Sequence, residues 1–114
     1  MIKGIGTDII EIARIQNSIR KFGADFLDHI LTREEIIHAK KFKSPFQHYA
    51  GRFAAKEAIY KALGNPQLSW QDIRITNDRS GQPQCFIRGK KSKKVLLSIS
   101  HCKTYATAVC VIES

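Results

Sequence analysis

Two carboxylates in the sequence, Asp8 and Glu57, stand where a charged side chain needs a partner. Asp8 lies near the end of an apolar segment, and Glu57 follows Phe53 by four residues, on the same face of an expected helix. Two carboxylates from separate elements suit a hard cation such as Mg²⁺, which keeps bound waters and relies on substrate phosphates. One hypothesis is therefore a magnesium site made by these two residues.

Both acids also have simpler interpretations that require no metal. Glu57 precedes Lys61 by four residues, the favourable order for an ion pair on a helix surface, worth a few tenths of a kcal/mol. Asp8 could cap the helix expected to begin shortly after it. No spacing rule connects residues so far apart in the chain, so the residues alone leave these alternatives open.

The segment that carries Glu57 also carries three cations, Arg52, Lys56 and Lys61. Arg52 and Lys56 lie four residues apart on one helical face, which is either a solvated basic surface or a clamp for phosphate groups. His101, in SISHCKTYA, can titrate near neutral pH. A lone histidine between apolar stretches is more often a hydrogen-bonded core or turn residue.

The elements that must position these residues begin with a strand and a helix. Residues 2–10 alternate isoleucines with Gly4 and Gly6, which predicts a short buried strand with two bare backbone positions. Apolar residues then recur at helical spacing over 12–22 and end at Gly23, which predicts an amphipathic helix. Its basic residues off the apolar stripe are Arg14, Arg20 and Lys21.

Two further helices and a sheet are expected in the rest of the chain. Thr32 and Glu35 have the spacing of a capping box, so a helix begins there and ends before Pro45. The segment 45–64 predicts a long helix closed by its final glycine. Beyond Trp70 a period of two predicts a small antiparallel sheet, with a turn at 78–81 and a solvated, strongly basic hairpin turn at 88–94.

Length and composition indicate one compact α+β domain over residues 1–114. The chain has 43% apolar and 25% charged residues, and a chain this short can need a second subunit to complete a substrate cleft. The net charge of +9 predicts an anionic partner: nucleic acid, an anionic membrane, a polyphosphate cofactor or an acidic protein. Three cysteines without a CxxC motif favour a reducing compartment, and no long apolar run is present, so we expect a cytoplasmic protein that does not act on membranes.

Four strings, in the order GIGTDIIEIARI, GRFAAKEAIYKALG, SWQDIRI and SISHCKTYATAVCVIE, resemble holo-acyl-carrier-protein synthases over nearly the whole chain. This is the short, trimeric type of 4′-phosphopantetheinyl transferase. The resemblance implies a fold in which a small antiparallel sheet packs against a long central helix and shorter helices. It also implies transfer of phosphopantetheine from coenzyme A to a carrier-protein serine in fatty acid biosynthesis, with release of adenosine 3′,5′-bisphosphate.

The resemblance also implies roles for individual residues. Asp8 and Glu57 are expected to bind Mg²⁺ together with the pyrophosphate of coenzyme A, and Glu57 to act as base directly or through water. Lys61 is expected to steady the developing charge. Arg52, Lys61 and His101 are expected to contact coenzyme A.

The expected partners are an acidic acyl carrier protein and two further copies of the chain. In the resembled family the active sites lie between the subunits of a homotrimer, so His101 is expected to serve a neighbouring site. The carrier protein is expected to dock on the basic first helix, through Arg14, Arg20 and Lys21. No nucleic-acid partner is expected.

The chain departs from the family pattern at two places. Ahead of GRFAAKE, where the family often has an arginine for the 3′-phosphate of coenzyme A, the sequence reads KKFKSPFQHY, so Lys43 or Lys41 is the substitute. After KALG only residues 65–68 precede SW, so the loop is short. Two rival hypotheses are a basic, non-enzymatic nucleic-acid-binding domain, which leaves Asp8 and Glu57 unexplained, and a structural subunit that keeps the fold without catalysis.

Overall fold

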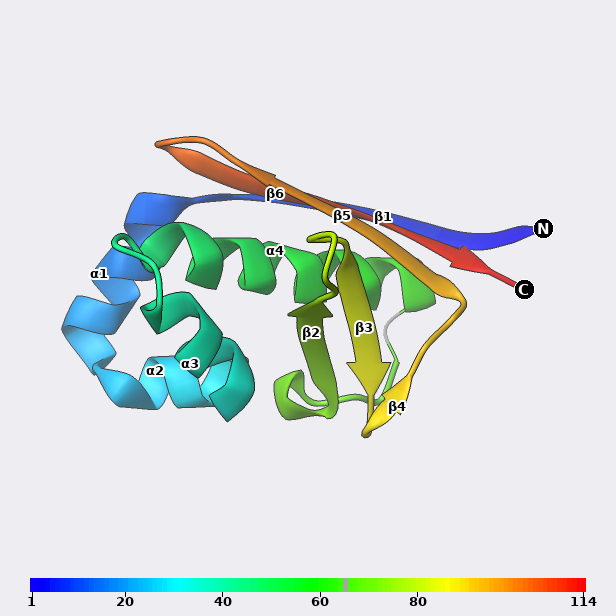
Figure 1. The fold of residues 1–114 in the computed structure, drawn as a ribbon, viewed down its shortest axis with the longest axis horizontal. Helices are drawn as coiled ribbons and strands as arrows, with labels where there is room; N and C mark the ends of the chain where they lie inside the picture. The colour runs from blue at the N-terminus through cyan, green and yellow to red at the C-terminus, as the bar shows by residue number, and fades with distance from the viewer. Residues whose placement is uncertain (65) are drawn as a thin grey trace.

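A long central helix separates a three-stranded sheet from the other elements of the fold (Figure 1). The computed structural model describes residues 1–64 and 66–114. The helix is α4 (Phe46–Leu63), and the sheet beside it is antiparallel with strand order β1-β6-β5. Its strands are β1 (Ile2–Glu11), β5 (Val95–His101) and β6 (Tyr105–Glu113).

Three short helices and a second antiparallel sheet lie on the other side of α4 (Figure 1). The helices are α1 (Ile12–Phe22), α2 (Ala24–Ile30) and α3 (Arg33–Lys40). The second sheet follows a 3-10 turn, η1 (Trp70–Asp72), and contains β2 (Ile73–Asn77), β3 (Pro83–Ile87) and β4 (Lys90–Lys91). The predicted α+β class and central helix are confirmed, but two three-stranded sheets are present where one small sheet was expected.

β1 packs closely against the backbone of α4 at two glycines. A Cβ atom added at Gly4 would clash with the carbonyl oxygen of Ala62, and one at Gly6 with that of Ala58. The two bare backbone positions therefore allow the strand to approach the helix closely. The approach fixes the register of the strand against the helix, because any larger residue would push them apart.

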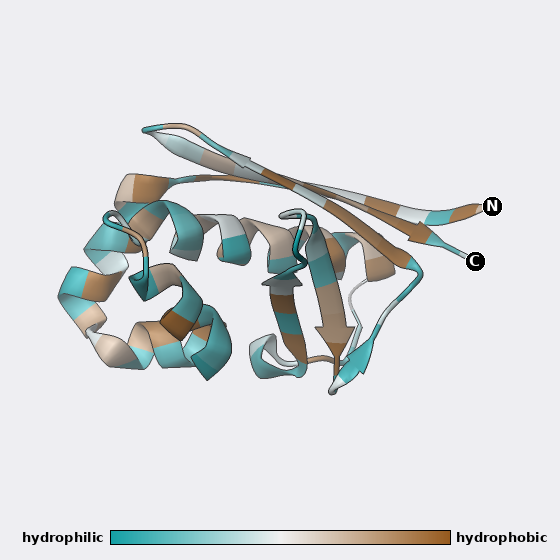
Figure 2. Cartoon of the chain, viewed as in Figure 1, coloured by the Kyte–Doolittle hydropathy of each residue, from teal (hydrophilic) through white to brown (hydrophobic). Residues whose placement is uncertain are grey.

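The prediction that β1 is a buried strand is wrong. Ile2, Ile5 and Ile9 are 65%, 67% and 63% exposed, and only Gly6 and Ile10 of the strand are buried. The strand itself is present, but the glycines occupy the face toward α4 and therefore leave Ile5 and Ile9 on the opposite face. Figure 2 shows apolar segments along β1, β5 and β6 on this outer layer.

The predicted helices form close to their expected limits. α1 ends at Gly23, and α4 ends at Gly64, which has the left-handed φ of 72° that suits glycine. The capping box of α3 is confirmed: the Thr32 N–H donates to the Glu35 carboxylate at 2.7 Å, and the Glu35 N–H donates to the Thr32 hydroxyl at 3.3 Å. α2 was not predicted, because a helix of only seven residues is too short to show a clear helical period.

Lys56 is fully buried and pairs with the equally buried Glu35, at 2.7 Å between Nζ and Oε1. Its ammonium also donates to the carbonyls of Ile30 and Trp70, and Glu35 accepts from the N–H of Ile75. The network ties α2, α3, η1 and β2 to α4. Neither the solvated basic face nor the phosphate clamp considered for Lys56 is therefore correct.

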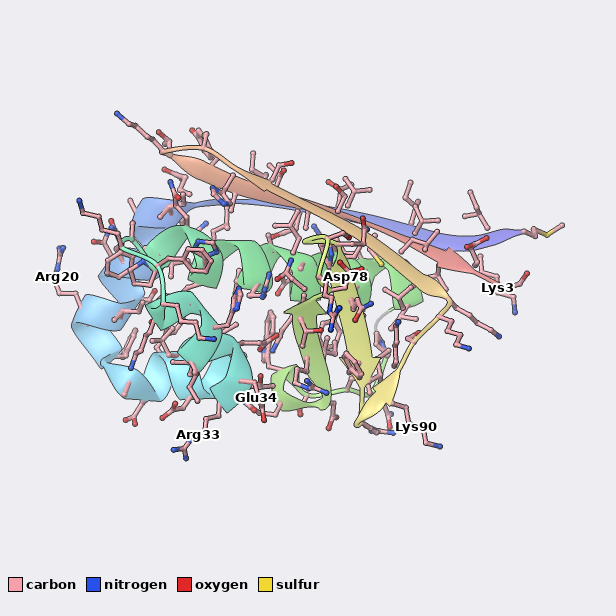
Figure 3. The ribbon with its side chains drawn as sticks, viewed as in Figure 1. Lys3, Arg20, Arg33, Glu34, Asp78 and Lys90 are labelled. Atoms are coloured by element: carbon pink, nitrogen blue, oxygen red, sulfur yellow. The ribbon has the colours of Figure 1, made fainter. Side chains whose placement is uncertain are left out.

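The two predicted turns are present. The carbonyl of Asp78 accepts from the N–H of Gly81, and the basic segment from Arg88 to Lys94 turns between β3 and β4 at Gly89. Lys90 points away from the fold in Figure 3.

The short loop noted after Gly64 begins at residue 65, which lies outside the described residues. None of the helices over 1–64 and 66–114 is long and apolar enough to cross a membrane.

Candidate functional site

Asp8 and Glu57 meet at one cavity although 49 positions separate them in numbering. The cavity, about 340 Å³, is lined by both acids and by Arg14, among others. Asp8 follows Gly6 by two residues and so lies on the strand face directed at α4. The close packing of β1 on α4 is thus what brings the two carboxylates to the same place.

Lys61 completes this group from α4. Its ammonium lies 3.2 Å from the Asp8 carboxylate and donates to the Thr7 carbonyl at 2.8 Å. The simpler interpretation of Glu57 expected Lys61 to pair with that residue, but the ion pair formed in the structure is with Asp8. The alternative that Asp8 caps the first helix is also wrong, because Glu11 is the N-cap of α1 and its side chain makes no capping bond.

The electrostatic setting of Glu57 favours a bound proton or cation. Burial raises the pKa of Glu57, the charge of Asp8 raises it further, and the charge of Lys61 lowers it. Within the described residues no group of three or more His, Cys, Asp or Glu side chains forms a candidate metal cluster. Two carboxylates are the donor set that Mg²⁺ uses when substrate phosphates provide further ligands, so Asp8 and Glu57 fit this ion.

A larger cavity, about 610 Å³, lies on the other side of Glu57. Tyr60, Trp70 and His29 are among its lining residues, and the Trp70 ring stacks on Phe53 with centroids 5.2 Å apart. Lys56 supports its wall by bonding the Trp70 carbonyl. No pattern in the sequence indicates this cavity. Trp70 lies near the start of the SWQDIRI string, where no periodic pattern predicts which way its side chain points.

Arg52 and His101, both expected to contact coenzyme A, line a third cavity of about 270 Å³. Arg52 is buried and donates to the side-chain oxygen of Asn77, while its Nε has no partner in the described part of the chain. This excludes a solvated face for Arg52. His101 is exposed at the end of β5, 5.6 Å from the His48 ring between centroids. Lys43 is exposed and does not line this cavity.

The carboxylate cavity and the Arg52 cavity lie on different sides of the subunit. Asp8 is on β1 and His101 is on β5, the two edge strands of one sheet, with β6 between them. Arg52 and Glu57 are five residues apart on α4, which places them about 140° apart around the helix axis. One subunit therefore does not gather all the predicted residues into a single cavity.

The three basic residues proposed for carrier docking lie on α1 in two different settings. Arg14 lines the cavity of Asp8 and Glu57. Arg20 and Lys21 are exposed at the end of the helix, where Arg20 points away from the fold in Figure 3 and the Lys21 ammonium lies 5.3 Å from the Phe22 ring centroid. Arg14 is thus the one of the three that adjoins the candidate site.

Comparisons with known proteins agree on one family. Residues 4–110 match the 4′-phosphopantetheinyl transferase superfamily. The chain is 48% identical to the holo-[acyl-carrier-protein] synthase of Protochlamydia amoebophila, with all of both chains covered. It is 42% identical to the holo-(acyl-carrier-protein) synthase of Bacillus anthracis, whose crystal structure is in complex with CoA (3′,5′-ADP); the TM-score is 0.85, over 100% of this chain and 98% of that one. The enzyme of Neisseria meningitidis is 36% identical, with a TM-score of 0.89 and complete coverage of both chains.

Proposed function

The chain belongs to the 4′-phosphopantetheinyl transferase superfamily, and on that basis we propose that it is a holo-acyl-carrier-protein synthase. It transfers 4′-phosphopantetheine from coenzyme A to a serine of an apo-acyl carrier protein and releases adenosine 3′,5′-bisphosphate. The observation that carries this function is the meeting of Asp8 and Glu57 at one cavity, with Lys61 paired to Asp8. These are the groups that a phosphoryl transfer needs: acids for a cation, a base and a cation for the developing charge.

Glu57 is the proposed base. It takes the proton of the serine hydroxyl, directly or through a water, as the serine oxygen bonds to the phosphorus that carries the pantetheine. The bond between that phosphorus and the bridging oxygen of the pyrophosphate breaks, and the bridging oxygen leaves on adenosine 3′,5′-bisphosphate. Without a bound cation, burial and then the charge of Asp8 raise the pKa of Glu57.

Asp8 and Glu57 are the proposed ligands of Mg²⁺. When bound, the ion neutralises charge on the pyrophosphate and so favours attack at phosphorus. Lys61 holds Asp8 for this role through their ion pair, and its ammonium also donates a hydrogen bond to the Thr7 carbonyl of the same strand. Lys61 remains half exposed, with 53% of its side chain accessible, and so can move from Asp8 toward a phosphate oxygen that bears developing charge.

Arg52 and His101 are the proposed contacts for the nucleotide part of coenzyme A, with Lys43 as an outlying cation. Arg52 supports this assignment through its buried Nε, which has a proton to donate and no acceptor among the residues described. His101 lies at the mouth of the same cavity. Coenzyme A that spans this cavity and the carboxylates bridges two subunits, because the two sets of residues lie at opposite edges of one sheet.

A homotrimer with active sites between subunits is therefore part of the proposal. The outer face of the β1-β6-β5 sheet provides a surface for it, since Ile5, Ile9, Leu96 and Val109 are each 46% to 67% exposed on these strands. An apolar face of this kind is typical of protein–protein contacts. Contact between subunits places the β5 edge of one beside the β1 edge of the next.

Docking of the acidic acyl carrier protein is proposed on α1. Arg14 lies at the rim of the carboxylate cavity, where a carrier serine must arrive, and Arg20 and Lys21 extend the basic surface outward. The net charge of +9 favours encounter with an acidic partner, and salt weakens this attraction by screening it.

We place this reaction of the single domain in cytoplasmic fatty acid biosynthesis, a setting in which the exposed thiol of Cys102 stays reduced.

The test is to incubate the protein with coenzyme A, Mg²⁺ and an apo-acyl carrier protein, and to weigh the carrier by mass spectrometry. We expect a gain of one phosphopantetheine per carrier, and no gain with Asp8→Ala or Glu57→Ala, whose circular dichroism should match that of the parent protein. A folded parent protein that adds no mass would refute the transferase. Tight binding of nucleic acid in its place would favour the basic binding domain.

A further inference from the structure

Four consecutive residues, 68–71, form one wall of the cavity of about 610 Å³ that Glu57 also lines. We name residues 67–72 the wall segment. Arg88 contacts this segment at both ends. Its guanidinium donates to the Gln67 carbonyl at 3.0 Å, and its Nε lies 3.7 Å from Oδ2 of Asp72. The residues that line the cavity thus lie between two points that one side chain contacts.

Other groups hold the middle of the wall segment from the buried side. The Gln71 amide donates to the carbonyls of Asp28 and Leu31, at 2.6 and 2.7 Å. The buried ammonium of Lys56 donates to the Trp70 carbonyl at 3.0 Å. Neither contact holds an end of the segment.

The backbone conformation of Arg88 is a costly one for an arginine. Arg88 and Gly89 join β3 to β4 with φ of 50° and 83°, the positive values that a two-residue type I′ turn requires. Asparagine followed by glycine is the favoured sequence of such a turn, because a larger side chain crowds the backbone when φ is positive. Arg88 is the single non-glycine residue with positive φ in the part of the chain that the structure describes. The two contacts of its guanidinium give a reason for an arginine here.

The side chain and the backbone of Arg88 hold the wall segment independently. The Arg88 N–H donates to the Asp72 carbonyl at 2.8 Å, a bond that does not need the side chain. The ion pair with Asp72 is long, and 65% of the Arg88 side chain is accessible, so this pair adds little to the stability of the fold. A substitution can therefore remove the guanidinium while the hairpin stays bonded to the wall segment.

We propose that Arg88 is a positioning residue for the transfer, which holds the ends of the wall segment and so fixes the cavity surface that Trp70 forms beside Glu57. The inference rests on the proposed function, in which Glu57 is the base. The Trp70 ring lies 5.7 Å from that of Tyr60, between centroids, and Tyr60 and Glu57 line the same cavity. A wall that moves changes the space in which a substrate is oriented beside Glu57, and small displacements of reacting groups lower rates strongly.

The variant that tests this is Arg88→Asn, which favours the left-handed turn and removes the guanidinium. We expect the midpoint of urea unfolding to stay the same or rise, because asparagine adopts positive φ more readily than arginine. Transfer at saturating coenzyme A and carrier should fall about tenfold, with the KM for the carrier changed less than about twofold. Arg88→Lys, which can reach one end of the segment at a time, should lie between the two.

The fluorescence of Trp70 gives a second measurement that does not depend on activity. Trp70 is the only tryptophan of the chain, so its emission reports on the wall segment. We expect acrylamide to quench it about twofold more strongly in Arg88→Asn than in the parent protein. Lys90→Ala is the matched control, because it removes an exposed cation of the same hairpin whose side chain points away from the fold (Figure 3). This control should change neither quenching nor transfer.

The inference requires that Arg88→Asn raise the quenching and lower the transfer without a loss of stability. Parent-like values in either measurement, a clear fall in the unfolding midpoint, or the same changes in Lys90→Ala would overturn it. If the parent transfers phosphopantetheine and Arg88→Asn behaves like the parent, the inference fails and the transferase stands. A parent that transfers nothing refutes the transferase. In that case stronger quenching in Arg88→Asn still supports the hold of Arg88 on the wall segment, and unchanged quenching overturns it.

Discussion

Glu57 is held beside Asp8 in a partly buried position, and this arrangement has opposite effects on stability and on chemistry. The raised pKa of Glu57 means that the folded state binds its proton more tightly than the unfolded state does. Below the ordinary value of 4.5 the residue is protonated in both states and imposes no penalty. As the pH rises through the folded pKa, the folded state must ionise this carboxylate, and the free energy of unfolding falls.

We therefore predict that, in the absence of Mg²⁺ and at a pH above the raised pKa of Glu57, Glu57→Gln stabilises the protein. The same variant should lower the rate of transfer by roughly 10²–10⁴-fold. Thermal unfolding with a chelator present should show a higher Tm for the variant near neutral pH, and a difference that shrinks as the pH falls toward the ordinary value. Glu11→Gln, at an exposed position of β1, controls for the loss of one negative charge. A variant with a lower Tm than this control at neutral pH would contradict the prediction.

At the scale of elements, the packing of β1 on α4 decides where the acids lie. We predict that Gly6→Ala lowers the free energy of unfolding by about 1–3 kcal/mol, because its Cβ meets the backbone carbonyl of Ala58, which cannot move aside alone. Transfer should fall more than stability explains, since Asp8 shifts relative to Glu57. Urea unfolding and the carrier assay measure both effects. Lys90→Ala, which removes an exposed side chain from β4, should change neither; equal losses in both variants would rule out the packing argument.

The buried Lys56–Glu35 pair is the second determinant at this scale. Lys56→Met leaves the Glu35 carboxylate buried without its cation, and we predict a loss of about 3–5 kcal/mol in the free energy of unfolding. Adding Glu35→Gln removes that charge and should restore part of the loss. Chemical denaturation of the parent, the single variant and the double variant measures this. A double variant less stable than the single one would show that the hydrogen bonds of Glu35, rather than the unpaired charge, dominate.

At the scale of the whole molecule, the proposed trimer depends on the exposed sheet face. We predict that Ile5→Lys, which puts a charge on an apolar residue that is 67% exposed, converts the trimer to folded monomers. Sedimentation and circular dichroism distinguish this result from unfolding. The matched control is Ile37→Lys, at a position 52% exposed on α3, away from the sheet. Trimers that persist in the Ile5 variant would exclude this face as the contact.

Active sites between subunits also predict complementation between inactive variants. Glu57→Gln and His101→Glu damage opposite edges of the sheet. If the two variants mix at random in equal amounts, about a quarter of the active sites should contain an intact Glu57 from one subunit and an intact His101 from the next. Asp8→Asn mixed with Glu57→Gln should recover none, because both residues line one cavity. The carrier assay on co-refolded mixtures measures the recovery. Equal recovery, or none, in both mixtures would refute sites shared between subunits.

Local features of the sequence determined much of the fold. The Thr32–Glu35 capping box, the closing Gly64 and the periodic isoleucines of α1 predicted helices that the structure contains, because each depends on residues within a few positions of one another. The family and its reaction were also evident from four ordered strings that span the chain. Gly4 and Gly6 indicated two bare backbone positions in a strand, but not that these face α4.

Only the tertiary structure decided where charged side chains lie. Nothing in the spacing of Lys56 and Glu57 indicates that the first is fully buried against Glu35 while the second faces Asp8, since both outcomes depend on elements far away in the chain. His38 and His48 carried no motif and line one cavity only because α3, α4 and β5 pack together. Burial and Coulomb interactions depend on distance in space, which residue spacing determines only within a single helix or strand.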